Sequence, residues 1–247
     1  MNTKDYIIKK TKKGKLHFSL LDPDKQKPER AGEIARIVTR AGSTAIMVGG
    51  STLSSQREVD ITVKAIKKNT DLPVILFPSS ARFLSRYADA VFFMSLLNSN
   101  KPEYIIREQA KGAIFVKKTG IEPLSMGYLI VEPGMTVGRV GDADLIKKDD
   151  VDTAIGYALA SQYLGMDFFY LEAGSGASYP ISNDMIKAVK KNTDIILIVG
   201  GGINDHEIAR EKAEAGADII VTGTSLERGD NNLYQRVHDI IKAIKEI

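Results

Sequence analysis

Apolar runs of strand length alternate with amphipathic stretches of helical period along most of the chain. The apolar runs predict strands at residues 16–21, 44–48, 73–77, 90–95, 127–131, 168–171, 195–199 and 218–222. The amphipathic stretches predict helices at residues 28–40, 54–69, 102–116, 149–164, 183–191, 205–215 and 232–246. The strands are continuously apolar, which is typical of a parallel sheet that helices cover on one face and side chains fill on the other. Eight such strands predict an α/β fold, a (β/α)8 TIM barrel formed by residues 1–247 as a single domain.

One helix of the barrel is expected to be short or missing. Between the third and fourth predicted strands only PSSARFLSRYAD, residues 78–89, is available. This stretch begins with a proline and leaves room for about two helical turns at most. We therefore expect a defect in the helical layer next to the third strand.

The composition fits one enzyme-sized domain. The 247 residues, 43% of them hydrophobic, match the roughly 250 residues typical of a (β/α)8 barrel. The 34 Lys and Arg residues against 31 Asp and Glu leave a net charge of +3, too small and too dispersed to indicate a nucleic-acid partner. The absence of cysteine excludes disulfides and thiolate chemistry. Because the polar N-terminus lacks the apolar core of a signal peptide, we expect a cytoplasmic protein.

The longest apolar stretch lies near residues 90–97. It is far shorter than the roughly 20 residues that span a bilayer. Any membrane contact is therefore expected to be peripheral.

Two glycine-bearing turns late in the chain predict a phosphate site. The turn GGGI at residues 200–203 follows the seventh predicted strand, and GTS at residues 223–225 follows the eighth. Glycine lets a backbone N–H approach an anion closely, and the helix that follows adds unpaired N–H groups. In (β/α)8 barrels, phosphate commonly binds at the loops after strands 7 and 8.

A carboxylate and hydroxyl groups follow the first two strands. Asp22 begins a Pro-containing turn after the first, and Ser51 follows a Gly-Gly pair after the second. A carboxylate at a strand end suits Mg²⁺, which binds one or two carboxylates and keeps waters for a phosphate-bearing substrate. Asp22 is the first candidate ligand, with a turn or capping role as its structural alternative. Residues 51–54 have helix capping as theirs.

The sixth strand carries the candidate catalytic group. Tyr170 and Glu172 alternate with Leu171, so both side chains should face the barrel mouth, and Gly174-Ser175-Gly176 follows them. A carboxylate beside a phenol suits a polyol, because the carboxylate can accept a proton from an attacking hydroxyl. The structural alternative is a packed tyrosine with a glutamate paired to a core lysine.

Several motifs together resemble one known family. They are LDPDK at 21–25, GGST at 49–52, YLEAGSG at 170–176, GGGI at 200–203 and TGT at 222–224. They resemble the geranylgeranylglyceryl phosphate synthases and their bacterial heptaprenylglyceryl phosphate relatives, over nearly the whole chain. YLEAGSG combined with GGGI is highly specific, whereas each glycine turn alone is a weak signal.

The resemblance implies a prenyltransferase of membrane lipid biosynthesis. Such an enzyme transfers a polyprenyl group from its diphosphate to the 3-hydroxyl of sn-glycerol 1-phosphate and releases diphosphate. Geranylgeranyl is the first candidate for the polyprenyl group. The product carries the first ether bond of archaeal-type membrane lipids. The resemblance also implies a requirement for Mg²⁺, a homo-oligomer that is a dimer or a hexamer, and a barrel whose third helix is replaced.

Residue by residue, the resemblance assigns roles to both ends of the barrel mouth. Asp22 and Ser51 would hold Mg²⁺ against the diphosphate, and Asp22 and Glu172 would be catalytic. The glycerol 1-phosphate site would comprise Tyr170, Leu171, Glu172, Ala173, Gly174, Ser175, Gly176, Gly201, Gly202, Gly223 and Thr224.

The chain departs from one branch of the family at two positions. Leu20 stands where that branch has a lysine, and Thr224 stands where it has asparagine. Lys25 is the candidate substitute for the missing lysine. Both departures resemble the second, largely archaeal branch.

The prenyl chain needs an apolar groove, for which the sequence offers a run beside the missing helix. Phe83, Leu84, Tyr87, Phe92, Met94 and Leu96 are its candidates, with ordinary core packing as the alternative for each. Tyr128 and residues 132–141 are the candidates for a cover over the site.

Two other signals are interpreted as structural. The acidic run at residues 149–152 lacks the spacing of an aspartate-rich prenyltransferase box and suits a helix N-terminus. The histidines His17, His206 and His238 have no metal-ligand spacing. Two other functions stay open on the residues alone: a different phosphate-binding (β/α)8 enzyme, such as a phosphosugar isomerase or an FMN-dependent enzyme, and a catalytically silent phosphate-binding barrel.

Overall fold

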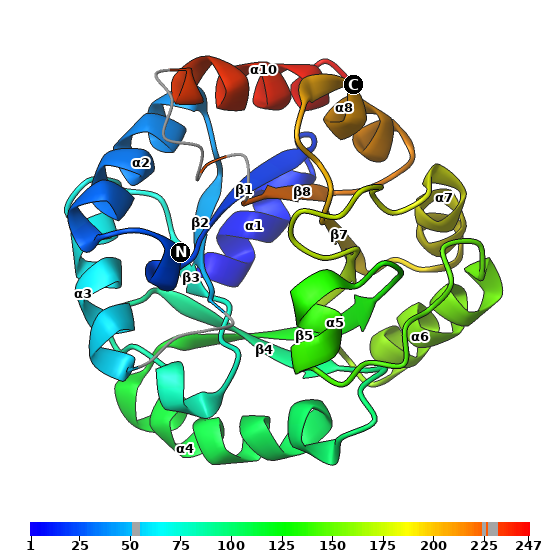
Figure 1. Cartoon of the computed structure of the whole chain (residues 1–247), viewed down its shortest axis with the longest axis horizontal. Coiled ribbons are helices and arrows are strands. Elements are labelled where there is room, and N and C mark those ends of the chain that lie inside the picture. The colour runs from blue at the N-terminus through cyan, green and yellow to red at the C-terminus, as the bar shows by residue number, and fades with distance from the viewer. Residues whose placement is uncertain (51–54, 224–225, 227–231) are drawn as a thin grey trace.

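The computed structural model is a closed barrel of eight parallel strands (Figure 1). It describes residues 1–50, 55–223, 226 and 232–247. The strands are β1 (Leu16–Leu21), β2 (Ala45–Val48), β3 (Val74–Leu76), β4 (Ala90–Leu96), β5 (Glu122–Ile130), β6 (Phe168–Glu172), β7 (Ile196–Gly200) and β8 (Ile219–Thr222). Each strand pairs with its neighbours in sequence, and β1 pairs with β8 to close the barrel. The predicted fold is confirmed.

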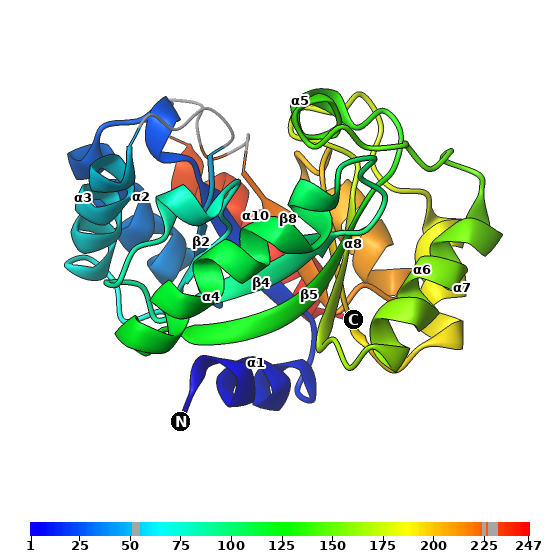
Figure 2. The same ribbon diagram turned by 90° about the horizontal axis from the view of Figure 1, so that it is seen from below.

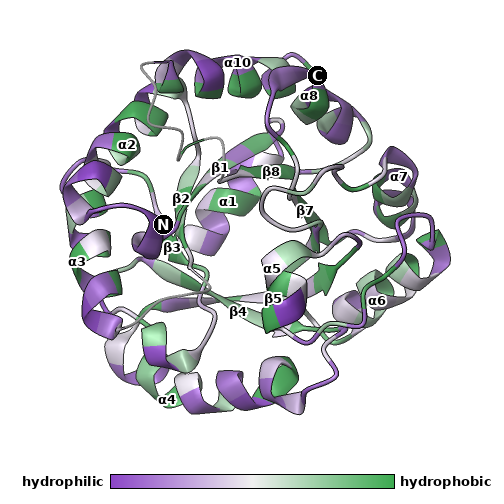
Figure 3. Ribbon diagram, viewed as in Figure 1, coloured by the Kyte–Doolittle hydropathy of each residue, from purple (hydrophilic) through white to green (hydrophobic). Residues whose placement is uncertain are grey.

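A ring of helices surrounds the strands. Its members are α2 (Pro28–Ala41), α3 (Gln56–Lys67), α4 (Glu108–Thr119), α6 (Val151–Tyr163), α7 (Asn183–Asn192), α8 (His206–Glu214) and α10 (Leu233–Lys245). Local signals fix their ends: α2 begins at Pro28 and ends before Gly42 in the left-handed conformation, and Asp205 caps α8 by accepting the Ile208 N–H. Hydrophobic residues concentrate on the strands and hydrophilic residues on the outward side of the helices (Figure 3).

The third helix is replaced by a short 3-10 turn, η2 (Ala81–Phe83). The pairing of strands is also short here, because β3 pairs with β4 only through Ile75 with Ala90 and Leu76 with Val91. The expected defect in the helical layer is therefore confirmed, and it lies beside the upper part of β4.

Three segments differ from the sequence prediction by more than one or two residues at an end. Strand β5 begins at Glu122 and not at residue 127. The prediction missed its first residues because they contain Pro123 and alternate between buried and accessible positions, so they form no continuous apolar run. The predicted helix at 102–116 is divided into a π-helix, η3 (Glu103–Arg107), and α4. The expected cover at 132–141 contains a helix, α5 (Met135–Val140).

A further helix, α1 (Thr3–Thr11), was not predicted. It lies beneath the barrel, at the end opposite α5 (Figure 2). Glu122 of β5 accepts the Thr3 N–H at 2.6 Å, Lys4 pairs with Asp167 at 2.6 Å, and the Ile7 side chain is fully buried in the barrel interior. The helix thus closes the lower end of the barrel. None of the helices in the described residues is long and apolar enough to cross a bilayer.

Candidate active site

A pocket with polar and apolar lining, about 680 Å³ including its open mouth, lies at the carboxyl ends of β6, β7, β8 and β1, and is called here the glycine pocket. It is lined by Leu20, Tyr170, Glu172, Ser175, Gly176, Ala177, Gly201, Gly202, Ile203, Asn204, Val221, Thr222 and Gly223. The structure therefore brings the two predicted glycine turns together with the polyol candidates of β6. Ser51 and Thr224 lie outside the described residues.

Glycine in the β7 turn makes room for the functional side chains of β6. A Cβ at Gly200 would lie 2.1 Å from the Tyr170 hydroxyl, and a Cβ at Gly201 would lie 2.5 Å from Oε1 of Glu172. Gly201 also has φ of +84°, which L side chains rarely adopt. The turn therefore exposes backbone N–H groups and lets Tyr170 and Glu172 reach the pocket.

Glu172 is buried, with 6% of the residue exposed, and the Gly174 N–H donates to its Oε1 at 2.7 Å. Burial raises the pKa of Glu172. The Gly174 N–H and the neighbouring hydroxyls of Tyr170 and Tyr128 oppose this shift, whereas the charge of Asp22 adds to it. In the described part of the chain no lysine pairs with Glu172, so the structural alternative for this residue is wrong. Its carboxylate is held by the Gly174 N–H and lies beside the phenols of Tyr170 and Tyr128, and it is suited to accept a proton.

The Tyr170 hydroxyl is buried and has no hydrogen-bond partner of good geometry among the described residues. A buried polar atom without a partner is unfavourable, so a ligand hydroxyl at this position would satisfy it. Burial, and then the charge of Glu172, raises the pKa of Tyr170 well above its usual range, so the phenol stays protonated. Tyr170 can therefore donate a hydrogen bond to a substrate at neutral pH.

Tyr128 belongs to the barrel interior and not to a cover. It is 3% exposed on β5, and its ring lies 5.2 Å from that of Tyr170 and 5.3 Å from that of Phe77. The cover interpretation of Tyr128 is wrong because strand alternation points this side chain inward, beside Glu172.

Asp22 directly follows β1 and lies at the mouth, with 14% of its side chain exposed. It makes no side-chain capping bond to η1 (Pro23–Lys25), and its Oδ2 lies 2.8 Å from Nζ of Lys25. A Cβ at Gly49 would lie 2.9 Å from Oδ1 of Asp22, so glycine is needed there for the carboxylate to reach the mouth. Lys25 thus pairs with the candidate metal ligand.

Three of the residues predicted to bind glycerol 1-phosphate do not present a side chain or a free N–H to the glycine pocket. The side chains of Leu171 and Ala173 are fully buried in the core between barrel and helices, so they face away from the glycine pocket. The Gly174 N–H donates to Glu172, so this N–H positions the carboxylate. Strand alternation accounts for the first two, and the tight turn after β6 for the third.

Some lining residues were missed from the sequence. Leu20, Ala177, Ile203, Asn204, Val221 and Thr222 also line the glycine pocket. Asn204 directly follows the GGGI turn, so its position was a usable signal. Leu20 was noted only as the position of an absent lysine.

An apolar groove of about 790 Å³ lies beside the glycine pocket, between the residues that replace the third helix, β4, α4 and α5. Of the predicted groove residues, Leu84, Phe92, Met94 and Leu96 line it; Tyr128 lines it as well. Phe83 and Tyr87 instead pack against the core between barrel and helices. Because Tyr128 lines the groove and Tyr170 lines the glycine pocket, the two spaces adjoin across this ring pair, next to Glu172.

The acidic run at residues 149–152 and the histidines His17 and His238 have structural contacts. Asp150 caps α6 by accepting the Thr153 N–H at 3.2 Å. His17 is buried between the hydroxyls of Ser43, at 3.0 Å, and Thr222, at 2.9 Å, and His238 stacks on Tyr234. The described residues contain no cluster of three or more acidic or histidine side chains that could enclose a metal.

Comparisons with known proteins agree with this geometry. The sequence profile of the PcrB family matches residues 6–245. A geranylgeranylglyceryl phosphate synthase of Thermococcus sibiricus is 54% identical over 98% of this chain and 96% of its own length. One of Methanothermobacter thermautotrophicus is 50% identical over the full length of both chains.

Solved structures give the same result. The (S)-3-O-geranylgeranylglyceryl phosphate synthase of Thermoplasma acidophilum, solved with sn-glycerol-1-phosphate, has a TM-score of 0.98 and 48% identity over all of both chains. A tryptophan synthase alpha chain of Legionella pneumophila, 16% identical with a TM-score of 0.64, shares the fold alone.

Proposed function

This chain belongs to the PcrB family, and we infer that it transfers a geranylgeranyl group from its diphosphate to the 3-hydroxyl of sn-glycerol 1-phosphate, releasing diphosphate. The observation that carries this function is the meeting of two unlike spaces at one carboxylate. The glycine pocket has a mixed polar and apolar lining, the groove is almost wholly apolar, and Glu172 lies where they adjoin. A phosphorylated polyol and a long hydrocarbon are the two reactants that such a site fits.

The glycine pocket supplies what a glycerol phosphate needs. Gly201, Gly202 and Gly223 offer a backbone surface without side chains for the phosphate. The unpaired Tyr170 hydroxyl and the Glu172 carboxylate supply a donor and an acceptor for the polyol. A relative with the same fold and 48% identity was solved with sn-glycerol-1-phosphate, which supports this assignment.

The apolar groove supplies the place for the prenyl chain. Its lining comes from both faces of β4, with Phe92, Met94 and Leu96 on one face and Val91 and Phe93 on the other. A groove of this kind favours a hydrocarbon by about 25 cal/mol for each Å² of apolar surface removed from water. The missing third helix is what leaves this surface uncovered.

Mg²⁺ is part of the proposal, with Asp22 as the protein ligand. A carboxylate at the mouth that belongs to no cluster of three or more acidic or histidine side chains among the described residues fits an ion that completes its shell with substrate oxygens and water. Bound there, Mg²⁺ would offset the charge of the diphosphate group. Lys25, whose Nζ lies 2.8 Å from Oδ2 of Asp22, would lie next to the same diphosphate.

The chain's own residues then account for the transfer. The glycine pocket holds the acceptor hydroxyl beside Glu172, and the groove holds the allylic carbon of the donor. The bond between that carbon and the diphosphate oxygen breaks with its electron pair on the diphosphate, the acceptor oxygen forms the ether bond, and its proton passes to Glu172. The closed barrel interior keeps water from competing for the allylic centre.

The test is a direct assay of the reaction. The protein is incubated with Mg²⁺, labelled glycerol 1-phosphate and geranylgeranyl diphosphate, and the label is sought in an organic extract. We expect an extractable product that depends on both substrates and on Mg²⁺. If no prenyl diphosphate of any length yields product, the proposed function is wrong; binding of glycerol phosphate without turnover would indicate a silent binding barrel.

A further inference from the structure

The wall of the apolar groove that replaces the third helix has little regular structure of its own. Residues 78–84, called here the turn segment, contain only the single turn η2. Five of them, Pro78, Ser79, Ser80, Ala81 and Leu84, line the groove. The opposite wall is α4, a helix of 12 residues. The position of the turn segment relative to α4 therefore decides how wide the groove is.

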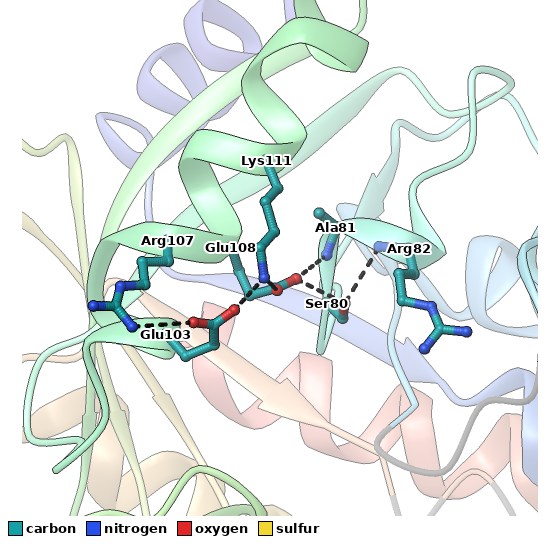
Figure 4. Close-up of polar contacts among 7 residues, drawn as sticks. All are labelled: Ser80, Ala81, Arg82, Glu103, Arg107, Glu108 and Lys111. Carbon is teal, nitrogen blue, oxygen red and sulfur yellow. Dashed lines mark hydrogen bonds and ion pairs between the residues drawn. The ribbon is translucent and has the colours of Figure 1, made fainter.

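One side chain of α4 bonds directly to the turn segment. Oε2 of Glu108 accepts the Ser80 hydroxyl and the Ala81 N–H, both at 2.7 Å (Figure 4). Lys111, one turn further along α4, donates to Oε1 of Glu108 at 2.8 Å. The carboxylate thus uses one oxygen to hold the turn segment and the other to bind its own helix.

Packing one turn along α4 reinforces this link. A Cβ at Gly112 would lie 3.1 Å from the Leu84 side chain and 3.5 Å from Ala81. The absence of a side chain at this position lets the turn segment approach α4 closely. Glu108 and Gly112 both line the groove, so the link is part of its wall and not remote from it.

The Glu108 carboxylate stays ionised far below neutral pH. Partial burial disfavours its charge, but hydrogen bonds from Lys111, Ser80 and Ala81 outweigh that effect and lower the pKa of Glu108 to about 2. Hydrogen bonds to an ionised acceptor are about twice as strong as neutral ones. The geometry therefore describes a firm attachment of a short turn that would otherwise be held by few contacts.

Resting on the proposed function, we propose that Glu108 is a positioning residue for the prenyl chain: by bonding Ser80 and Ala81 it sets the width of the groove and so the preference for donor length. Each methylene that contacts a fixed wall adds to donor affinity. A wall that moves away gives less advantage to a longer chain. Binding of glycerol phosphate occurs in the other pocket and does not depend on this wall.

The experiment compares Glu108→Ala and Glu108→Gln with the wild type. KM and kcat are measured for geranylgeranyl diphosphate and for the shorter farnesyl diphosphate at saturating glycerol 1-phosphate, and then KM for glycerol 1-phosphate. In Glu108→Ala we expect KM for geranylgeranyl diphosphate to rise roughly tenfold, the equivalent of one lost charged hydrogen bond. We also expect the ratio of kcat/KM between the two donors to fall, while KM for glycerol 1-phosphate changes by less than about twofold.

Glu103→Ala is the matched control. Glu103 pairs with the same Lys111 and with Arg107, and its recorded partners are on α4 and η3 instead of on the turn segment (Figure 4). We expect it to leave both KM values and the donor ratio unchanged. If Glu108→Ala is poorly folded, Ser80→Ala removes one of the same bonds from the other side and is expected to lower the donor ratio in the same direction.

The outcomes separate this inference from the proposed function. An active wild type whose Glu108→Ala and Ser80→Ala variants keep the wild-type donor ratio and KM values would overturn the role of Glu108 alone. An equal rise of KM for both substrates would also overturn it, because that indicates a general structural effect. A wild type inactive with every donor would overturn the proposed function, and this inference with it.

Discussion

The surroundings of the Glu172 carboxylate have opposing effects on its pKa. Burial in the barrel disfavours the charge, whereas the Gly174 N–H and two phenols favour it. The net effect is a raised pKa, which suits a group that must accept a proton at a working pH near neutrality. The same environment makes the ionised carboxylate unfavourable for folding.

Replacing Glu172 with Gln should separate chemistry from binding. The amide keeps an oxygen for the Gly174 N–H but cannot accept the proton, so we expect product formation to fall at least about 100-fold. Affinity for glycerol 1-phosphate, measured by calorimetry, should stay within a few-fold of wild type. Turnover near the wild-type rate would contradict the role of Glu172.

The raised pKa of Glu172 in the ligand-free protein predicts the acid side of the pH profile of kcat/KM. Only the ionised form accepts the proton, so activity should be present above its folded pKa and lost as pH falls through it. Because burial raises that pKa, the loss should begin at a higher pH than an exposed glutamate would give. The check is kcat/KM between pH 4 and 8; an acid limb at or below the usual glutamate pKa would contradict the assignment.

Glu172 also predicts an effect on stability. A carboxyl group whose pKa is higher in the folded state binds protons more tightly there, so stability falls as pH rises from the unfolded to the folded pKa. Above this window the ionised carboxylate lowers the free energy of unfolding. The Glu172→Gln protein should therefore unfold at the same or a higher denaturant concentration than wild type at pH 8. Near pH 4 this difference in stability should be smaller or absent.

At the scale of elements, the loop after β7 shows why two neighbouring glycines have different reasons. Gly202 lines the pocket where a phosphate is expected, with φ of +71°. Gly200 has an ordinary backbone conformation, and its requirement comes from Tyr170 on the adjacent strand. One short turn thus serves both the proposed phosphate contact and the placement of the Tyr170 side chain.

Gly200→Ala should displace Tyr170 and leave Gly201 and Gly202 of the glycine pocket unchanged. The new Cβ would meet the Tyr170 hydroxyl at 2.1 Å, so the ring or the strand must shift, and we expect roughly 1–3 kcal/mol lower stability and a higher KM for glycerol 1-phosphate. In the Gly200→Ala protein, the second substitution Tyr170→Phe removes the atom in closest contact and should recover part of the lost stability. Gly156→Ala in α6, where a Cβ meets nothing within 4 Å, is the control and should be neutral or stabilising. Urea unfolding of all four proteins checks the set.

At the scale of the whole molecule, the two ends of the barrel do different work. The upper end carries both pockets, whereas α1 covers the lower end and contacts neither. Ile7→Ala should therefore lower the free energy of unfolding by about 2–5 kcal/mol, the usual result of emptying a buried aliphatic site. Both KM values should stay unchanged; a large rise in either would contradict this separation.

A buried histidine links stability to pH. His17 is held between Ser43 and Thr222, and burial, with the charge of Lys245, lowers its pKa to about 3. Between that value and its unfolded pKa the unfolded chain binds the extra proton, so stability is lost as pH falls below about 6.5, by about 1.4 kcal/mol for each unit. His17→Gln should remove this part of the slope in urea unfolding between pH 7 and 4. Identical slopes in the two proteins would contradict it.

The sequence anticipated the parts of the site that follow from local rules. Strand alternation placed Tyr170 and Glu172 on one face, and the glycine turns after β7 and β8 marked the position of the glycine pocket. The helix α1 escaped because its short polar stretch acquires a role only against Glu122 and Asp167. The lower half of β5 escaped because Pro123 interrupts its pattern.

What the sequence determined by itself is the succession of eight strands, the gap after β3, and the residue types at each strand end. These depend on periodicity and on backbone chemistry that act over a few residues. What only the tertiary structure decided is contact between distant segments. Tyr128 lies beside Glu172, Lys25 pairs with Asp22, and Glu108 bonds to Ser80. Those contacts depend on how the barrel closes, because closure brings side chains from separate strands and helices to one mouth.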